Sequence, residues 1–550
     1  MLASRLDRLG EARLLLQRAS VYGRSVPLDL LRFLSPEAPD FFDSLLERAV
    51  LSGLVGREAD PSGELFSFRH ALIAEAALAS LPAPSRKLLH QQIGETIRNR
   101  FPERAAATPE LVARHFEGAE DWPLAVEWYG KAGETAFSKG FLSETELLLR
   151  SAIRILPRCA PAPGVRTAEI RLRLLLGKVL LDLYGMGIPE AGEAFRKALS
   201  LVESGTTVSE EAFYALYCCW ESLYGGIDLR ESRRVADSLL LMAGNSGNAN
   251  FRIASLYADG STAFYEGRFV RSKASVEECI ALSETSGKDT GMIVWGKGIV
   301  QTALDYRVWN FWYSGRYRSA RGALDSRLAL ASETLQKKGH ILTFAAMMFR
   351  YFRFPDRVLA VVDLLLDFLR SANTEIWSCS EIGFRGWAIV QQGDPAGIPM
   401  ILRSVFLSRR CHNIARVQYL ALLSDAYLAL GRFREARGVA DSALHFSEKS
   451  GTFFFDAELW RLKGEAALLD ARREEARECF GTALEIGRRQ GARALELRTA
   501  TSLGRFLGDA GKRKEALALF SGLSELLDGP ESDPSLPDIR DALETRTQLS

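Results

Sequence analysis

One segment of the sequence has the outline of a phosphate-binding loop, Gly291-Met-Ile-Val-Trp-Gly-Lys297-Gly298. Such a loop requires Gly-x-x-x-x-Gly-Lys-Ser/Thr after a strand, so that backbone N–H groups hold the phosphates and the hydroxyl holds magnesium. Here the hydroxyl is missing, the loop positions are bulky and apolar, and the segment falls where the repeat described below requires a helix. We therefore expect no nucleotide site at this segment.

The other reactive side chains are scattered along the chain. The sequence contains no Cys-x-x-Cys pair, no His-Glu-x-x-His helix, no nucleophile elbow and no cluster of acids and histidines with usable spacing. We therefore expect reduced cysteines in the core, no metal, no cofactor and no enzymatic activity. The residues concerned are Cys159, Cys218, Cys219, Cys279, Cys379, Cys411 and Cys479, and His70, His90, His115, His340, His412 and His445.

Aromatic residues are concentrated in two segments, Tyr306 to Tyr313 and Phe344 to Phe354. Most of these side chains are expected in the core, because aromatic residues at helical spacing usually pack inside. The remainder would line a concave groove for a ligand or a peptide. Trp309, Trp312 and Tyr313 are the candidates for this groove.

The composition is that of an ordinary soluble protein. Of 550 residues, 47% are hydrophobic and 25% are charged, and the formal net charge of +1 creates no field that attracts nucleic acid or an anionic membrane. The most apolar run, Val358 to Leu369, is too short to cross a bilayer, and residues 1–20 lack the apolar stretch of a signal peptide. We expect a cytoplasmic protein without membrane contact.

A chain of this length exceeds one hydrophobic core, and its last third repeats with a period of forty residues, anchored at Ser424, Gly464 and Gly504. The anchor and the third position after it share one face of a helix, whereas the twelfth, sixteenth and nineteenth positions share one face of a second helix. A small residue at the seventh position ends the first helix. The residues predicted to pack the repeats are Ser424, Tyr427, Ala436, Gly464, Ala476, Phe480, Ala483, Gly504, Ala516 and Phe520.

Weaker copies of this template occur upstream, so that roughly ten helix pairs are expected between about residues 108 and 528. One pair cannot bury its apolar face alone, and the pairs must therefore stack. The arrangement of Gly, Tyr and Ala resembles the tetratricopeptide family, which implies a right-handed helical solenoid. The weaker copies lie around Gly133, Gly177, Gly260, Trp312 and Gly386, the last with Leu402 and Val405 as packing positions of its second helix.

The first 95 residues do not follow the template. Helical stripes within residues 6–16, 28–34 and 41–51 are followed by two β-prone runs between Gly53 and Phe68, around an Asp-Pro-Ser-Gly turn. Helices followed by a small hairpin predict a winged helix.

The segments Arg5-Leu-Asp-Arg-Leu9 and Phe68-Arg-His-Ala-Leu-Ile73, with Ser80-Leu81, Arg86 and Leu89-His90, resemble the winged-helix module of signal-transducing ATPases of the STAND type. The segments Ala457–Glu465, Glu485–Gly491 and Glu496–Leu503 look like the last repeats of those proteins. In many bacterial members the winged helix joins an upstream ATPase, and sometimes a class III adenylate or guanylate cyclase domain, to a tetratricopeptide array. The resemblance implies that this chain is their C-terminal half, from a split or truncated gene or adapted to work without its own ATPase.

The resemblance also bears on His70. The segment Phe-Arg-His-Ala-Leu resembles the Met-His-Asp motif with which some related ATPases sense bound ADP, although Ala71 replaces the acid. His70 is therefore a candidate nucleotide sensor, and the alternative is a histidine that begins a helix beside the hairpin. The expected DNA-reading helix, Ser44 to Leu51, carries one arginine against one glutamate, so we do not expect DNA binding.

The sequence thus predicts an all-α protein with three parts. They are a winged-helix-like domain at 1–95, a tetratricopeptide-like solenoid at 96–528, and a linker with a capping helix at 529–550. We expect a non-catalytic sensor or scaffold that binds a protein, a peptide or a small-molecule inducer and relays this state to an ATPase or cyclase module. The alternatives are a transcription regulator whose winged helix contacts DNA and a truncated member of the adenylate/guanylate cyclase family.

Overall fold

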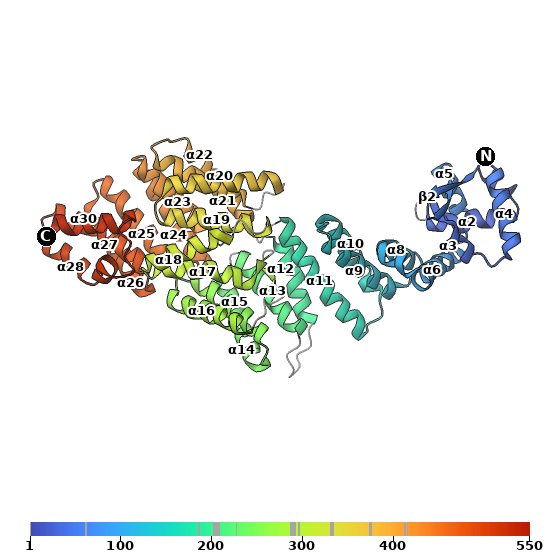
Figure 1. Ribbon diagram of the computed structural model, residues 1–550, viewed down its shortest axis with the longest axis horizontal. Coiled ribbons are helices and arrows are strands. Elements are labelled where there is room, and N and C mark those ends of the chain that lie inside the picture. Colours follow the sequence, from blue (N-terminus) through green and yellow to red (C-terminus); the bar gives the residue numbers. More distant parts are fainter. Residues whose placement is uncertain are drawn as a thin grey trace. The chain divides into compact units, whose positions relative to one another are not determined.

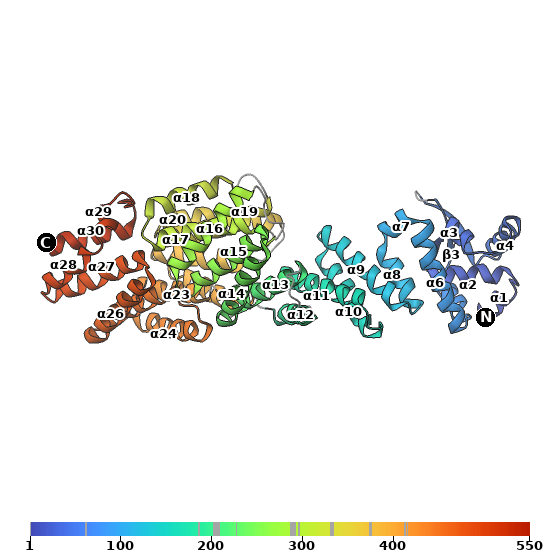
Figure 2. The same cartoon turned by 90° about the horizontal axis from the view of Figure 1, so that it is seen from below.

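The computed structural model describes residues 2–60, 63–184, 188–201, 210–226, 228–286, 293–294, 297–330, 335–372, 377–411, 414 and 416–550. Of the segment Gly291–Gly298, the structure describes Ile293–Val294 and Lys297–Gly298, which form two short strands, so the expectation of a helix at these positions is wrong. His412 lies outside the described residues. The chain, drawn in Figures 1 and 2, divides into two compact units, Met1–Val179 and Leu180–Ser550.

The first unit begins with helices and a three-stranded antiparallel sheet. Strand β3 pairs with β1 on one side and with β2 on the other, so the strand order is β1-β3-β2. The Phe66 and Phe68 side chains of β3 are buried, whereas the end of β2 is exposed. The hairpin is therefore buried on one part and exposed on the other. The elements are α1 (Leu2–Asp7), α2 (Ala12–Tyr22), β1 (Ser25–Pro27), α3 (Leu28–Phe33), α4 (Pro39–Leu51), β2 (Val55–Asp60) and β3 (Gly63–Phe68).

The predicted hairpin is confirmed, with strands on either side of the turn. The sequence did not predict β1, because this strand has three residues and contains a proline, which cannot donate to the sheet. The rest of the unit is helical. Its elements are α5 (Ala71–Ala79), α6 (Ala83–Arg100), α7 (Pro102–Ala107), α8 (Pro109–Gly118), α9 (Trp122–Ser138), α10 (Leu142–Ile155), the 3₁₀ turn η1 (Leu156–Arg158) and most of α11 (Pro163–Tyr184).

The second unit is a stack of antiparallel helix pairs, and its described part contains eight consecutive pairs after α12 (Pro189–Leu201). The first helices are α13 (Glu210–Gly226), α15 (Ala249–Tyr265), α17 (Ile299–Tyr313), α19 (Leu335–Tyr351), α21 (Ser378–Gln391), α23 (Arg416–Ala429), α25 (Asp456–Leu469) and α27 (Arg493–Asp509). The second helices are α14 (Leu229–Ser246), α16 (Phe269–Ser286), α18 (Tyr317–Leu330), α20 (Pro355–Ala372), α22 (Gly397–Cys411), α24 (Phe433–Ser450), α26 (Arg473–Gln490) and α28 (Arg513–Ser521). The short strands β4 (Ile293–Val294) and β5 (Lys297–Gly298), and the helices α29 (Ser524–Asp528) and α30 (Pro537–Leu549), complete it.

These pairs confirm the predicted all-α, tetratricopeptide-like fold. In nine pairs of consecutive helices, the first helix ends two residues before a residue with positive φ, at the seventh position of the template. This left-handed conformation stops a helix and suits glycine. The nine residues are Glu120, Gly140, Gly267, Gly315, Arg353, Gly393, Gly431, Ala471 and Gly511.

The template anchors lie against the second helix of their own pair. A Cβ atom on Gly464 would lie 2.6 Å from Cε1 of Phe480, and one on Gly504 would lie 3.1 Å from Cε2 of Phe520. In the pair of α23 and α24, the Ser424 hydroxyl donates to the carbonyl of Ala436 at 2.9 Å. The predicted packing residues Tyr427, Ala436, Ala476, Phe480, Ala483, Ala516 and Phe520 are all buried.

The pair of α21 and α22 departs from the template by one residue. A Cβ on Gly386 would collide with the Gly397 carbonyl and lie 3.0 Å from Ile401, which is buried, whereas Leu402 is 46% exposed. The prediction that Leu402 packs in this pair is therefore wrong. The turn Gly393-Asp-Pro-Ala-Gly397 starts the second helix with a different register, because Asp394 caps the turn at Ala396.

The solenoid of the second unit closes on itself. Phe454 N–H, between α24 and α25, donates to the carbonyl of Tyr265 at 3.1 Å, and α17 contacts α27. Arg318 of α18 donates to the Ser532 carbonyl at 2.6 Å, on the segment that follows α29. The buried apolar side chains from Phe213 to Leu549 consequently form one continuous cluster. The concave face is therefore an interior instead of an open groove.

Candidate binding site

The interior of the second unit contains an aromatic cavity of about 110 Å³, here called the inner cavity. The first helices of six consecutive pairs, α13 to α23, contribute side chains to its wall, because these helices face inward. Aromatic rings make up most of the wall, with Met347, Ile414 and several polar groups among them. The residues used below are Tyr224, Tyr257, Tyr265, Thr302, Asp305, Tyr306, Trp309, His340, Phe344, Ser380 and Tyr419.

Tyrosines form one side of the inner cavity. The hydroxyls of Tyr224 and Tyr306 are hydrogen-bonded to each other, and the rings of Tyr224 and Tyr265 meet edge to face with centroids 5.6 Å apart. Burial raises the pKa of Tyr224, Tyr257 and Tyr306 well above the usual value. The phenols therefore stay protonated at neutral pH and act as neutral donors and acceptors.

Asp305 places a charged group at the wall of the inner cavity. Its carboxylate accepts hydrogen bonds from Arg327 Nε at 2.8 Å and pairs with His340 Nε2 at 2.6 Å. Arg327 also donates to Gln301 Oε1 at 2.7 Å. Because Asp305 and Arg327 are both buried, this pairing compensates the carboxylate charge inside the protein.

Two donors of the inner cavity have no partner among the described residues. The Thr302 hydroxyl and the Trp309 indole N–H are buried and make no hydrogen bond. Trp309 is held by a stacked contact with Phe264, whose ring centroid lies 4.8 Å away. A buried donor without an acceptor costs about 1–3 kcal/mol, so an acceptor supplied from outside would be stabilised here.

The predicted groove residues separate in the structure. Trp309 lines the inner cavity, whereas Trp312 and Tyr313 are fully buried beside Tyr351 and do not line it. Sequence reasoning missed Thr302 and Asp305, which lie on the same helix as Trp309, and it included Tyr306 in the aromatic segment without choosing it as a groove residue. An aspartate one helical turn before a tryptophan, in an aromatic-rich helix, was the available signal.

His70 lies at the other end of the chain, in the first unit. It occupies the N-cap position of α5, is exposed, and makes no capping hydrogen bond with its side chain. Two other histidines of this unit contact each other through a hydrogen bond, with His90 Nδ1 and His115 Nδ1 3.0 Å apart.

A second cavity, of about 310 Å³ and here called the polar cavity, lies farther along the same inner helices. Phe344 and Met347 of α19 line the inner cavity and Arg350 lines the polar cavity, and α21 and α23 likewise contribute to both. Three residues along a helix correspond to about 4.5 Å. The two cavities are therefore neighbours that share three helices.

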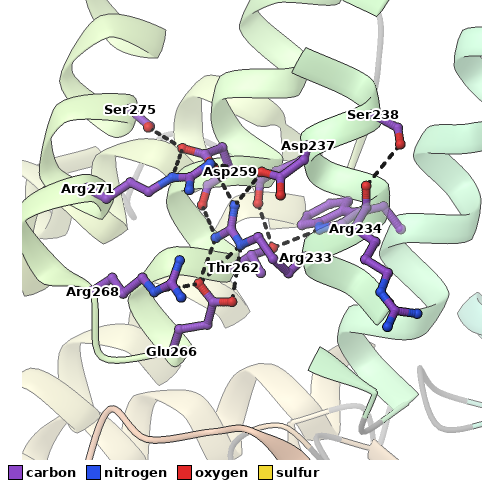
Figure 3. A network of polar contacts seen from close by, with 12 residues as sticks. Arg233, Arg234, Asp237, Ser238, Asp259, Thr262, Glu266, Arg268, Arg271 and Ser275 are labelled. Atoms are coloured by element: carbon purple, nitrogen blue, oxygen red, sulfur yellow. Dashed lines mark hydrogen bonds and ion pairs between the residues drawn. The ribbon is translucent and has the colours of Figure 1, made fainter. Parts of the chain in front are cut away.

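A charged network in the second unit joins α14, α15 and α16 (Figure 3), and the residues of this network named below line neither cavity. Arg233 donates to Glu266 at 3.0 Å and to Asp259, which also accepts from Ser275. Burial raises the pKa of Asp259, but the contacts with Arg271, Ser275 and Arg233 outweigh it and lower the pKa overall. Because Arg233 and Asp259 satisfy each other, the network fastens neighbouring helices and offers no open ligand position.

No cluster of three or more His, Cys, Asp or Glu side chains suited to a metal ion occurs among the residues described above. Within the same residues, no helix has both the length and the apolar character needed to cross a membrane.

No family model matches the chain. An uncharacterized protein of Rhizobium meliloti strain 1021 is 24% identical over 516 residues, which are 92% of this chain and 49% of that protein. The chain thus spans about half the length of the curated relative it matches.

Solved structures with similar folds include a Rap protein complexed with Competence and Sporulation Factor (TM-score 0.37, 11% identity, 78% of this chain and 99% of that chain). Others are the APC/C hetero-tetramer Cut9–Hcn1 (0.46, 13%, 87% and 93%) and a STAND protein with a tetratricopeptide repeat sensor from Pyrococcus horikoshii (0.28, 13%, 84% and 66%). With these scores, the fold assignment rests on the helix pairs of the chain itself.

Proposed function

We propose that the chain is a non-catalytic sensor and scaffold whose solenoid binds a ligand in the inner cavity. The observation that carries this proposal is the pair of buried, unpartnered donors, Thr302 Oγ1 and Trp309 Nε1, in an aromatic wall. Apolar cavities with a few convergent polar groups are typical small-molecule sites.

The wall defines the chemistry of the ligand. Aromatic rings favour an apolar or aromatic body, and Trp309 requires a hydrogen-bond acceptor such as a carbonyl oxygen. A cavity of about 110 Å³ suits a single ring, so a small inducer or one side chain of a peptide fits and a folded partner does not. The Asp305 charge is already balanced by Arg327, so a neutral group is favoured.

The first 95 residues are proposed to relay the bound state as a winged helix. From α2 onward, the order helix, strand, two helices and hairpin, with the strand order β1-β3-β2, supports this assignment. Leu51 of α4 is 84% exposed and Phe33 of α3 is 62% exposed, which favours contact with another protein module. The proposed receiver of this signal is an ATPase or nucleotide cyclase module. If the chain is instead a truncated member of the cyclase family, the receiver would be the cyclase domain of that family.

A role in DNA reading is disfavoured by the charges of α4. This helix carries Asp40, Asp43 and Glu47 against Arg48, and Arg48 donates to the Leu9 carbonyl at 3.1 Å. Phosphates would be repelled by such a helix. Salt-dependent binding of the full chain to a promoter fragment would instead favour the transcription-regulator alternative.

The ligand site is tested with Trp309→Phe, which removes the indole donor and keeps an aromatic ring. Benzamide, with one ring and a carbonyl acceptor, is the small-molecule probe, and N-acetyl-tyrosinamide represents a peptide side chain. Both are titrated into the full chain by calorimetry. We expect benzamide to bind about ten-fold more weakly to the variant, because one buried hydrogen bond is lost.

Trp312→Phe is the matched control, since Trp312 Nε1 is also buried without a partner but does not line the inner cavity. Its affinity for the probe should equal that of the unmodified chain. Equal weakening by both variants, or no binding of either probe, would contradict the proposed site. The full chain alone should neither hydrolyse ATP nor form cyclic nucleotides, and activity in either assay would contradict the non-catalytic role.

A further inference from the structure

The polar cavity contains five arginines and five carboxylates, and four of the arginines are engaged by the protein. Arg461 donates to Glu458 at 2.8 Å, and Arg498 donates to Asp538 at 2.7 Å. Arg353 donates to Asp541, and Arg505 donates to the Thr545 hydroxyl. The charges of the lining are therefore balanced in number, and these four guanidinium groups have partners.

Arg350 is the exception. Its side chain is 3% exposed, its Nη1 atom is buried without a hydrogen-bond partner, and no carboxylate among the described residues lies within ion-pair distance. Its guanidinium lies over the rings of Phe455 and Tyr351, with centroids 5.3 and 5.6 Å away. Aromatic rings attract a cation but accept no full-strength hydrogen bond, so Nη1 has no acceptor among the described residues around the cavity.

We propose that the polar cavity binds a small monocarboxylic acid, whose carboxylate pairs with Arg350. A planar guanidinium matches the two oxygens of a carboxylate. The charge of Arg350 helps to lower the pKa of Glu458, but no ion pair of contact distance joins the two side chains, and a buried cation without a contacting partner is costly. A single negative charge fits best, because the lining already contains five carboxylates that would repel a dianion such as phosphate. With about 310 Å³, the polar cavity has ample room for a small acid.

This site is independent of the inner cavity, although both are lined by α19, α21 and α23. The inner cavity requires a neutral acceptor for Trp309, whereas the polar cavity requires a charged acceptor for Arg350. The proposal for the inner cavity can therefore fail while the proposal for the polar cavity holds, or the reverse. Trp309→Phe tests the first, and Arg350→Met tests the second.

Calorimetric titration of the full chain at constant ionic strength tests the proposal. The probes are acetate and propionate as small acids, acetamide as their neutral analogue, N-acetylglycylglycine as a peptide C-terminus, and inorganic phosphate. We expect the small acids to bind, and acetamide and phosphate to bind at least about ten-fold more weakly. Tighter binding of the peptide than of propionate would replace the small-acid proposal by a peptide site.

Arg350→Met removes the donors and keeps an apolar side chain beside Phe455. It should weaken propionate binding by about ten- to one-hundred-fold, the loss of hydrogen bonds to a charged group. Arg473→Met is the matched control, because Arg473 lies over Phe506 at 5.1 Å but is exposed and lines neither cavity. Trp309→Phe should also leave propionate binding unchanged.

If Arg350→Met does not fold, Arg350→Lys preserves the charge and should retain weakened binding, because an ammonium group lacks the planar pair of donors. The relative affinities of the unmodified chain for the small acids, acetamide and phosphate also test the proposal without any variant. Failure of acetate and propionate to bind, equal binding of phosphate, or unchanged binding by Arg350→Met or Arg350→Lys would each overturn the proposal.

Discussion

At the scale of single residues, the repeat anchors are fixed by the space between two helices. Gly464 lies so close to Phe480 that a Cβ atom would be 2.6 Å from its ring, and Phe480 is fully buried. Gly464→Ala should lower the free energy of unfolding by about 1–3 kcal/mol, because the buried ring must move. Urea denaturation measures this change.

Gly481 provides the control for that substitution. It also lies within a helix, α26, but nothing lies within 4 Å of a Cβ atom added there. Gly481→Ala should stabilise the protein by about 0.5–1 kcal/mol through the helix preference of alanine. Destabilisation of similar size at both positions would show that close packing is not the cause.

The pair of His90 and His115 predicts a dependence of stability on pH. Burial, then the charges of His90 and Arg114, lower the pKa of His115 to about 3. Since a histidine in the unfolded chain has a pKa of about 6.5, the unfolded state takes up protons first as the pH falls. Stability is therefore lost below about pH 6.5, by about 2 kcal/mol at pH 5.

Hydrogen exchange of the peptides that contain α6 and α8 measures this loss at pH 7 and pH 5, after correction for intrinsic rates. His115→Phe removes the titrating ring and should flatten the dependence on pH. His445→Phe, on an exposed part of α24 far along the chain, should leave it as it is. An unchanged slope in His115→Phe would assign the loss to other groups.

The sequence predicted the spacing of the repeat residues, but it did not predict which side chains surround each residue in the folded protein. The glycine anchors were visible because they recur every forty residues. Trp309, Trp312 and Tyr313 were equivalent in the sequence, and only the tertiary structure assigns Trp309 to a cavity and the others to the core. No sequence pattern singled out Arg350, because its lack of an ion-pair partner depends on which side chains surround it in the folded protein.

At the scale of elements, each first helix needs a left-handed residue to end it. Ala471 has a φ of 59°, while Gly431 and Gly511 occupy the same position in the neighbouring repeats with φ of 70° and 75°. Ala471→Gly should raise the free energy of unfolding by about 0.5–1 kcal/mol, because glycine adopts this conformation without the steric cost of a Cβ atom.

Gly431→Ala is the reciprocal change and should cost about 1 kcal/mol in the same thermal or urea denaturation. Nothing lies within 4 Å of a Cβ atom added at Gly431, so crowding does not contribute. A gain at position 471 without a loss at position 431 would mean that backbone strain is not the common cause.

The template predicted where most helices end, because the turn residues are local signals. It failed in the pair of α21 and α22, where the turn after Gly393 starts the second helix in a different register and Leu402 faces solvent. Strand β1 was also missed, since three residues pair with β3 through contacts that are distant in sequence. Local patterns predict helices and turns, and pairing between distant segments requires the fold.

At the scale of the whole second unit, polar contacts with the segment before α30 hold the solenoid closed. Glu531 accepts from Arg316 Nε at 3.1 Å and from the Ser319 hydroxyl at 2.6 Å, and Asp533 pairs with Arg321 at 2.8 Å. Replacement of both acids, Glu531→Gln with Asp533→Asn, should destabilise the closed form by about 1–2 kcal/mol. Hydrogen exchange should increase in both α18 and α30.

Glu515→Gln is the control, because the Glu515–Arg477 pair joins neighbouring repeats on an exposed surface. It should change stability by less than about 1 kcal/mol and leave exchange in α18 unaffected. Faster exchange in α30 alone would show that this helix frays without opening the solenoid. The sequence predicted a stack but not its closure, since Arg316 and Glu531 are separated by 215 residues and no repeat relates them.

Closure also changes how the array must fold and unfold. An open stack of repeats has stability that adds up between nearest neighbours, so its ends fray and folding begins at any repeat. The contacts of Tyr265 with Phe454 and of Arg318 with Ser532 tie early repeats to late ones, which couples the loss of one end to the loss of the other. The second unit should therefore lose structure cooperatively, and its last folding step should be the slow meeting of distant segments that a linear array does not require.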